Sequence, residues 1–91
     1  MTRDDLAEAV YRRHGGLSRR ESRLLVDRLL DRIKQALLYG SAVRISGFGR
    51  FEVVRRRARR GRNPSTGQRI EIAPRRRLIF RPSRRLIDGL N

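Results

Sequence analysis

Apolar residues in the first part of the chain recur at the spacing of an α-helix and form two stripes. The first stripe consists of Leu6, Ala7, Val10 and Tyr11. The second consists of Leu25, Val26, Leu29, Ile33, Ala36 and Leu37. Thr2 and Ser18 each stand three residues before an acidic residue, in the pattern of a capping box. Glycines follow both stripes, at 15–16 and at 40. The pattern predicts two amphipathic helices that bury these stripes and are joined by a short turn.

Beyond residue 42 the apolar residues alternate with polar ones, which is the period of a β-strand. Alternating runs occupy residues 43–45, 51–53 and 78–80, and Gly47-Phe48-Gly49 provides a tight reversal between the first two. The three phenylalanines (48, 51 and 80) are expected in the core. Ser83 follows Pro82 and can cap a short last helix. The expected fold class is therefore α+β, with two N-terminal helices, a three-stranded antiparallel sheet and a short C-terminal helix.

Residues 55–73 do not fit into that body. If the second strand continues, Arg55, Arg57 and Arg59 lie on one side of it, and Arg56 and Arg60 lie with Ala58 on the other. Both faces are then cationic and cannot be buried without a large desolvation cost. After a turn at residues 63–67, residues 69–72 alternate again as a returning strand. The pattern predicts a long hairpin arm that protrudes from the body, with Pro64 near its tip.

The charge of the chain is strongly biased. Its 91 residues carry a net charge of +15, and residues 55–91 hold 13 basic and 2 acidic side chains. Such an excess favours a polyanionic partner, with nucleic acid first and an anionic membrane second. The chain has no cysteine, so neither a disulfide nor a thiolate metal site can supplement the small core. Oligomerisation is the remaining common remedy.

Residues that could support catalysis have simpler explanations. Asp4, Asp5 and Glu8 suit the positive end of the first helix better than a metal site. The hydroxyl residues 46, 65 and 66 have no evident base nearby, and His14 lies beside helix-ending glycines. We therefore expect no enzyme, no catalytic residue, no metal or other cofactor, and no small-molecule substrate. No apolar run is long enough to span a membrane, so a cytoplasmic location is expected.

Three stretches together resemble the HU and integration host factor family of bacterial DNA-bending proteins. They are SGFGRFEV (46–53), RRGRNPSTGQRIEI (59–72) and FRP (80–82). The likeness covers essentially the whole chain, and Ser46 and the RRRLIFRPSRRL segment lean towards the alpha subunit of integration host factor. It differs at Ser83, where that pattern usually has glycine, and at Arg77, which replaces an apolar residue.

The resemblance implies one domain over residues 1–91 that forms an intertwined dimer. Residues 1–40 would form the helical dimerisation base, 41–54 and 75–82 the sheet, 55–74 the DNA-binding arm and 83–91 the last helix. The arms would enter the minor groove of double-stranded DNA, and Pro64 would wedge between base pairs and bend the duplex. The residues expected to contact DNA are Arg55, Arg57, Arg59, Arg60, Arg62, Asn63, Pro64, Arg69, Arg75, Arg76, Arg81 and Arg85.

Some alternatives remain open at this point. The partner subunit can be a second copy or a related chain, and DNA binding can be specific or non-specific. A structural RNA-binding protein, such as a basic ribosomal component, would share the charge but would not explain the R-x-G-R-N-P tip. The resemblance implies a location in the nucleoid.

Overall fold

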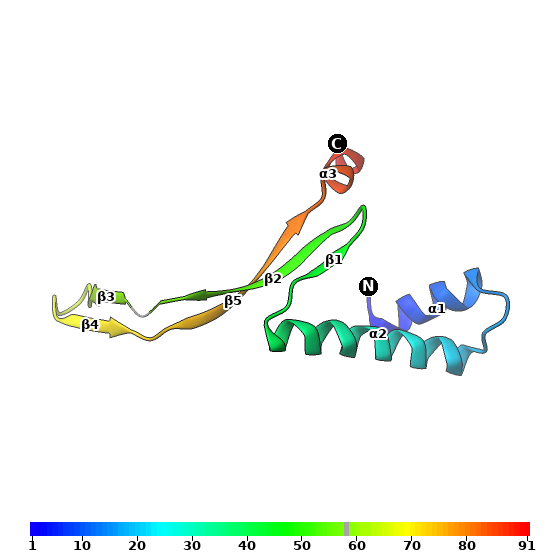
Figure 1. The fold of residues 1–91 in the computed structure, drawn as a ribbon, viewed down its shortest axis with the longest axis horizontal. Helices are drawn as coiled ribbons and strands as arrows, with labels where there is room; N and C mark the ends of the chain where they lie inside the picture. Colours follow the sequence, from blue (N-terminus) through cyan, green and yellow to red (C-terminus); the bar gives the residue numbers. More distant parts are fainter. Residues whose placement is uncertain (58) are drawn as a thin grey trace. The chain divides into compact units, whose positions relative to one another are not determined.

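The computed structural model describes residues 1–57 and 59–91, and for residues 59 and 72 it describes the backbone alone. Ala58, which the sequence places in the cationic run, lies outside the described residues. The elements in chain order are α1 (Arg3–Arg13), α2 (Arg19–Tyr39), β1 (Val43–Ile45), β2 (Gly49–Arg56), β3 (Arg59–Arg62), β4 (Arg69–Ile72), β5 (Arg75–Pro82) and α3 (Arg84–Leu90) (Figure 1). They form two compact units, Met1–Ala36 and Leu37–Asn91. No helix among the described residues combines the length and the apolar character that a membrane crossing requires.

Both long helices begin at the capping boxes that the sequence predicts. The Thr2 hydroxyl accepts a hydrogen bond from the Asp5 amide at 3.2 Å, and the Asp5 carboxylate accepts one from the Thr2 amide at 2.8 Å. Ser18 and Glu21 make the same reciprocal pair at the start of α2, both bonds measuring 3.0 Å. These bonds satisfy amides that a helix start leaves without partners. They also lower the pKa of Glu21, mainly through the backbone amide of Ser18.

Small side chains allow close packing in the first unit. Ala7 of α1 and Ser22 and Val26 of α2 are all buried. Exposed ion pairs also join the two helices. In one of them, the guanidinium of Arg19, the first residue of α2, lies 3.2 Å from the carboxylate of Glu8 in α1. Exposed pairs of this kind contribute about 0.2–1 kcal/mol each.

The predicted buried face of α2 is only partly buried in one copy of the chain. Val26 is buried as expected, but Leu25 and Leu29 are 51% and 58% exposed. The expectation for these two leucines was wrong for the single chain. A stripe that extends over most of a 21-residue helix is wider than the short α1 can cover. Part of the apolar stripe on α2 is therefore uncovered in one copy of the chain.

In the second unit, β2 lies between β1 and β5 in an antiparallel sheet, as predicted. The register places Phe51 opposite Phe80 and Val53 opposite Leu78. The rings of Phe51 and Phe80 are 4.7 Å apart, and Phe48 lies 5.3 Å from Phe80. Both strands of the β2–β5 ladder are longer than the sequence predicts, because β2 reaches Arg56 and β5 begins at Arg75. The ladder continues past the apolar alternation into the arginine run.

One glycine in this sheet is required by packing. A Cβ atom at Gly49 would lie 2.7 Å from the Phe80 ring and 2.7 Å from the Arg81 carbonyl oxygen. No side chain fits that space. The Phe80 ring therefore crosses the backbone of β2 at a position that only glycine can occupy, which helps to keep β2 and β5 in their register.

The C-terminal helix begins where predicted. The Ser83 hydroxyl accepts a hydrogen bond from the Leu86 amide at 3.1 Å, and the Ser83 amide donates to the Phe48 carbonyl at 2.9 Å. Ser83 thus caps α3 and ties it to the reversal between β1 and β2. Serine performs this role at the position where the integration host factor pattern usually has glycine.

We predict that Ser18→Ala lowers the free energy of unfolding by about 1 kcal/mol, because it removes the N-cap acceptor of α2. Urea denaturation followed by circular dichroism at one fixed protein concentration would measure it. Ser41→Ala, which alters an exposed serine before β1, serves as the matched control and should change stability by less than about 0.5 kcal/mol. Equal stabilities for the two variants would contradict the capping role.

Candidate nucleic-acid interface

The arm is a second antiparallel ladder. Within the described part of the chain, β3 and β4 form a two-stranded sheet of their own, with Arg60 opposite Glu71 and Arg62 opposite Arg69. Partners in such a ladder point to the same side, so Arg60, Arg62 and Arg69 share one face with Glu71. Ile70 belongs to the other face and is 43% exposed. The register therefore gathers Arg60, Arg62 and Arg69 on one face of the arm.

The alternation that the sequence predicts for residues 55–60 is interrupted. β2 ends at Arg56, paired with Arg75, and β3 begins at Arg59, paired with Ile72. Arg57 lies in neither strand. Pro74 stands next to Arg75 in the returning chain, and proline has no amide proton to donate to a ladder. The second strand, whose continuation the two-sided placement of these arginines assumed, ends at Arg56, next to the position where the returning chain has Pro74.

The tip of the arm is closed by its own hydrogen bonds. The Asn63 amide donates to the Gln68 carbonyl at 2.8 Å, and the Gly67 amide donates to the Asn63 carbonyl at 2.7 Å. The Asn63 side chain accepts a bond from the Ser65 amide at 2.9 Å. Gly67 has a φ of +71°, which favours glycine at this position. Pro64 directly follows Asn63 in this turn and is exposed at the tip of the arm.

Two pairs of arginines, one on each face of the ladder, lie where the β2–β5 ladder meets the arm. Arg55 lies opposite Arg76, and Arg56 lies opposite Arg75. Like charges directly opposite in a ladder repel one another. Arg76 is engaged elsewhere, because its guanidinium donates to the carbonyls of Leu37 at 3.2 Å and Leu38 at 2.9 Å. The repulsion that remains would be relieved by an anion at the base of the arm.

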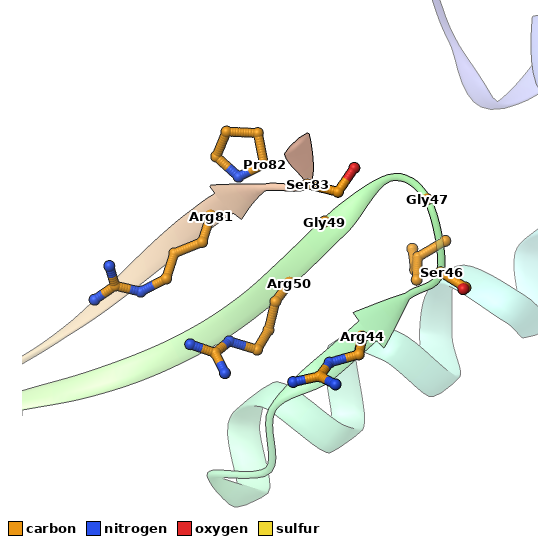
Figure 2. Close-up of a pocket in the computed structure, with 9 residues that line it drawn as sticks. Arg44, Ser46, Gly47, Gly49, Arg50, Arg81, Pro82 and Ser83 are labelled. Atoms are coloured by element: carbon orange, nitrogen blue, oxygen red, sulfur yellow. The ribbon is translucent and has the colours of Figure 1, made fainter. Parts of the chain in front are cut away.

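A row of cations also crosses the sheet. Arg44, Arg50 and Arg81 belong to β1, β2 and β5, and the register places Arg50 opposite both of the others. Figure 2 shows the three side chains extending to the same side of the sheet. They border a hollow of about 320 Å³ that also includes Ser46 and Ser83. Guanidinium and hydroxyl donors around one hollow are the groups that bind phosphate oxygens.

Sequence reasoning did not select Arg44 or Arg50, although a signal for them existed. Both alternate with apolar residues that were assigned to the core, and this places them on the opposite face of the strands. Arg81, by contrast, was among the residues expected to contact DNA. The register shows that the three form one row, which the separate runs in the sequence do not reveal.

Glu52 neutralises part of this row. The Arg81 Nε atom donates to the Glu52 carboxylate at 2.5 Å, and Arg50 Nη2 lies 3.5 Å from the second carboxylate oxygen. The hydrogen bond from Arg81 and the nearby charge of Arg50 lower the pKa of Glu52. The carboxylate therefore lies between two guanidinium groups.

The remaining predicted residues are distributed over the second unit. Arg85 of α3 lies beside the β1–β2 reversal, where its Cδ atom would be 3.6 Å from a Cβ atom built on Gly47. The backbone of Arg59 opens β3, but its side chain lies outside the described residues. The structure brings Arg60, Arg62 and Arg69 together on the arm and groups Arg81 with two unpredicted arginines on the sheet.

These features, a capped helix pair, a three-stranded sheet and a cationic arm with an exposed proline, agree with a family comparison. The family model described as "Bacterial DNA-binding protein" matches residues 1–91, and the chain belongs to this family. Integration host factor subunit alpha from Jannaschia sp. (strain CCS1) is 51% identical over 88 residues, which cover 97% of this chain and 87% of that protein. The same subunit from Myxococcus xanthus (strain DK1622) is 47% identical over 91 residues, covering 100% of this chain and 70% of that protein.

Solved structures support the same fold. An Anabaena HU–DNA cocrystal structure aligns with a TM-score of 0.76 at 29% identity, covering 99% of this chain and 97% of that chain. An HU variant from Thermotoga maritima aligns with a TM-score of 0.68 at 23% identity over the full length of both chains, a likeness of fold alone. The predicted α+β class and the resemblance to the HU and integration host factor family are confirmed. Membership of this family also confirms the expectation of a non-enzymatic protein.

We predict that the pairing of Glu52 makes stability depend on pH at the acidic side. Its pKa in the folded chain is lower than the ordinary value of 4.5, so the contribution is fully present above that value. It is lost as the pH falls through the lowered pKa. Urea midpoints measured between about pH 6 and pH 3 for the native chain and Glu52→Gln should therefore converge on acidification. Asp88→Asn, on α3, is the matched control, and parallel curves for Glu52→Gln and the native chain would contradict the prediction.

Proposed function

We propose that this chain is an architectural nucleoid protein that binds duplex DNA with its arms in the minor groove and bends it. The observation that carries the proposal is the β3–β4 hairpin, with arginines along one face and an exposed proline on an ordered turn at its tip. A hairpin of this charge gains little from its own body and much from a polyanion. The family description and the likeness to the Anabaena HU–DNA cocrystal structure support DNA as that polyanion.

Pro64 acts as the wedge in this proposal. Its ring is rigid and apolar and carries no amide proton that would need a partner between bases. The hydrogen bonds of residues 63–68 hold the turn before DNA arrives, so little order has to be gained on insertion. Such a wedge unstacks a base step at a cost of a few kcal/mol and bends the duplex by roughly 20–90°. Contacts along the bent DNA offset this cost.

The arginines supply those contacts. Arginine suits the narrow minor groove because its guanidinium is planar and only weakly hydrated. Arg62 and Arg60, with Arg59, would enter the groove beside Asn63, and the sheet row formed by Arg44, Arg50 and Arg81 would receive phosphates of the bent duplex. The remaining proposed phosphate contacts are Arg57, Arg69, Arg75 and Arg85, whereas Arg55 lies opposite Arg76, on the other face of the β2–β5 ladder from Arg75. Phosphate contacts set position and orientation but carry little sequence information.

The functional unit is a dimer. Among the hydrophobic side chains of the described residues, Ala7 and Val26 are buried, whereas Leu29 and Leu78 are 58% and 57% exposed. A body with so small a core is completed by a second subunit, either a second copy or a related chain. The relatives named as the alpha subunit of integration host factor support this proposal. Two arms in one dimer would insert two wedges into the same duplex.

We predict that Pro64→Ala reduces DNA bending more than it reduces affinity. The alanine removes the rigid ring but leaves the arginines in place, so the dissociation constant should rise less than tenfold, equivalent to about 1.4 kcal/mol. End-to-end fluorescence energy transfer on a short labelled duplex would measure the bend. Ser65→Ala, the neighbouring position in the turn, is the control. An unchanged transfer efficiency in the proline variant would remove the wedge from the mechanism.

We predict that Arg62→Ala weakens DNA binding at all sequences and lowers the salt dependence. Loss of one phosphate contact reduces the log–log slope of affinity against salt by about 0.9. Arg28→Ala, which removes an exposed arginine from α2, should leave the slope unchanged. A salt-independent affinity of the native chain, or tighter binding to a structured RNA than to duplex DNA at the same ionic strength, would contradict the proposed function.

A further inference from the structure

We propose that Arg76 is a positioning residue, which anchors the base of the arm to the last turn of α2, and that it does not contact phosphate. Sequence reasoning groups it with Arg75 and Arg81 as residues past which DNA would run. The structure separates it from both. The inference rests on the proposed function for its DNA measurements but not for its measurement on the free protein.

Arg76 lies on a different face of β5 from Arg75 and Arg81. In β5, the side chain of Arg76 lies on the same face as those of Leu78 and Phe80, which are paired with apolar residues of β2. Arg75 and Arg81 lie on the opposite face of β5, which carries the row formed by Arg44, Arg50 and Arg81. A duplex that lies on that row meets Arg75 and Arg81, whereas Arg76 points to the opposite side of the sheet.

The guanidinium of Arg76 contacts the backbone of α2. One nitrogen of Arg76, Nη2, donates to the carbonyls of Leu37 and Leu38 at 3.2 and 2.9 Å. These carbonyls belong to the last turn of α2, whose final carbonyls have no partner within the helix, and the Leu37 carbonyl also accepts a hydrogen bond from the Gly40 amide at 3.1 Å. The last turn of α2 contains no basic residue of its own. Arg76 thus supplies, from 38 positions further along the chain, the positive charge that a helix C-terminus favours.

Arg76 also lies near the beginning of β5, where the returning arm joins the sheet. Two positions before it, at Pro74, the ladder that joins the arm to the sheet is interrupted. Arg76 is therefore the side-chain anchor next to the point where the arm continues without the support of the sheet. All of these groups lie within the second compact unit, Leu37–Asn91. Loss of the anchor should let the arm move over a wider range and insert Pro64 less accurately.

The test compares Arg76→Ala with Arg75→Ala, which removes the same charge from the adjacent residue on the other face. In the free protein, ¹⁵N relaxation should give lower order parameters for the amides of β3 and β4 in Arg76→Ala than in the native chain or Arg75→Ala. With duplex DNA, Arg75→Ala should lower the salt slope by about 0.9, whereas Arg76→Ala should leave the slope unchanged and reduce the bend.

Arg76→Lys completes the test and also serves if the alanine variant does not fold. Lysine keeps the charge but lacks the planar fork, so its arm order parameters should fall below the native values while the salt slope stays native. Native order parameters in this variant would overturn the proposal, as would a slope reduced by Arg76→Ala to the same extent as by Arg75→Ala. Absence of DNA binding by the native chain would instead refute the proposed function and leave the free-protein comparison decisive for Arg76.

Discussion

The register between β2 and β5 is the constraint on which the rest of the structure depends. Phe51 lies opposite Phe80, and the Phe80 ring fits against Gly49 at a distance that excludes any side chain there. Because side chains alternate across a strand, a slip of one residue would move Arg50 or Arg81 to the aromatic face. The same register continues to Arg56 and Arg75 and so determines the orientation of the arginines at the base of the arm. Aromatic packing in the sheet thereby sets which charges point towards a ligand.

A single copy of the chain leaves several large apolar side chains exposed and carries a net charge of +15. Leu25 and Leu29 on α2 and Leu78 on β5 are each more than half exposed. The excess charge is concentrated in residues 55–91, where 13 basic residues accompany 2 acidic ones. Glu52 relieves the charge on the sheet by pairing with Arg81 and Arg50. A second subunit meets the first requirement and a polyanion the second, so assembly and binding both complete the fold.

Local rules predicted a large part of this structure. The capping boxes at Thr2 and Ser18, the ends of the helices and the Asn63–Gly67 turn each depend on groups within a few positions of one another. The strands of the sheet followed from alternation, and their order is that of neighbouring antiparallel hairpins. The resemblance to a known family then supplied the meaning of the arm. For these elements the short-range sequence contains nearly all of the necessary information.

Other features depend on contacts between distant positions. The exposure of Leu25 and Leu29 reflects the short length of α1, which the stripe on α2 does not reveal. The sequence shows the charge of Arg76 but not the α2 carbonyls to which its guanidinium donates. The break in the arm ladder was within reach of sequence reasoning, since Pro74 cannot donate to a ladder, but it required knowing which residue lies opposite. For the features of the sheet, the sequence did not reveal which residues lie opposite one another.

The cationic face of the arm consists of guanidinium groups, and Lys34 is the sole lysine of the chain. Arginine stays charged throughout the physiological range of pH and does not undergo the acetylation that removes charge from lysine. Enzymes that tune other basic proteins by acylating amines therefore have no substrate on this surface. The occupancy of DNA would instead follow the amount of protein, the ionic strength and the supply of the partner subunit.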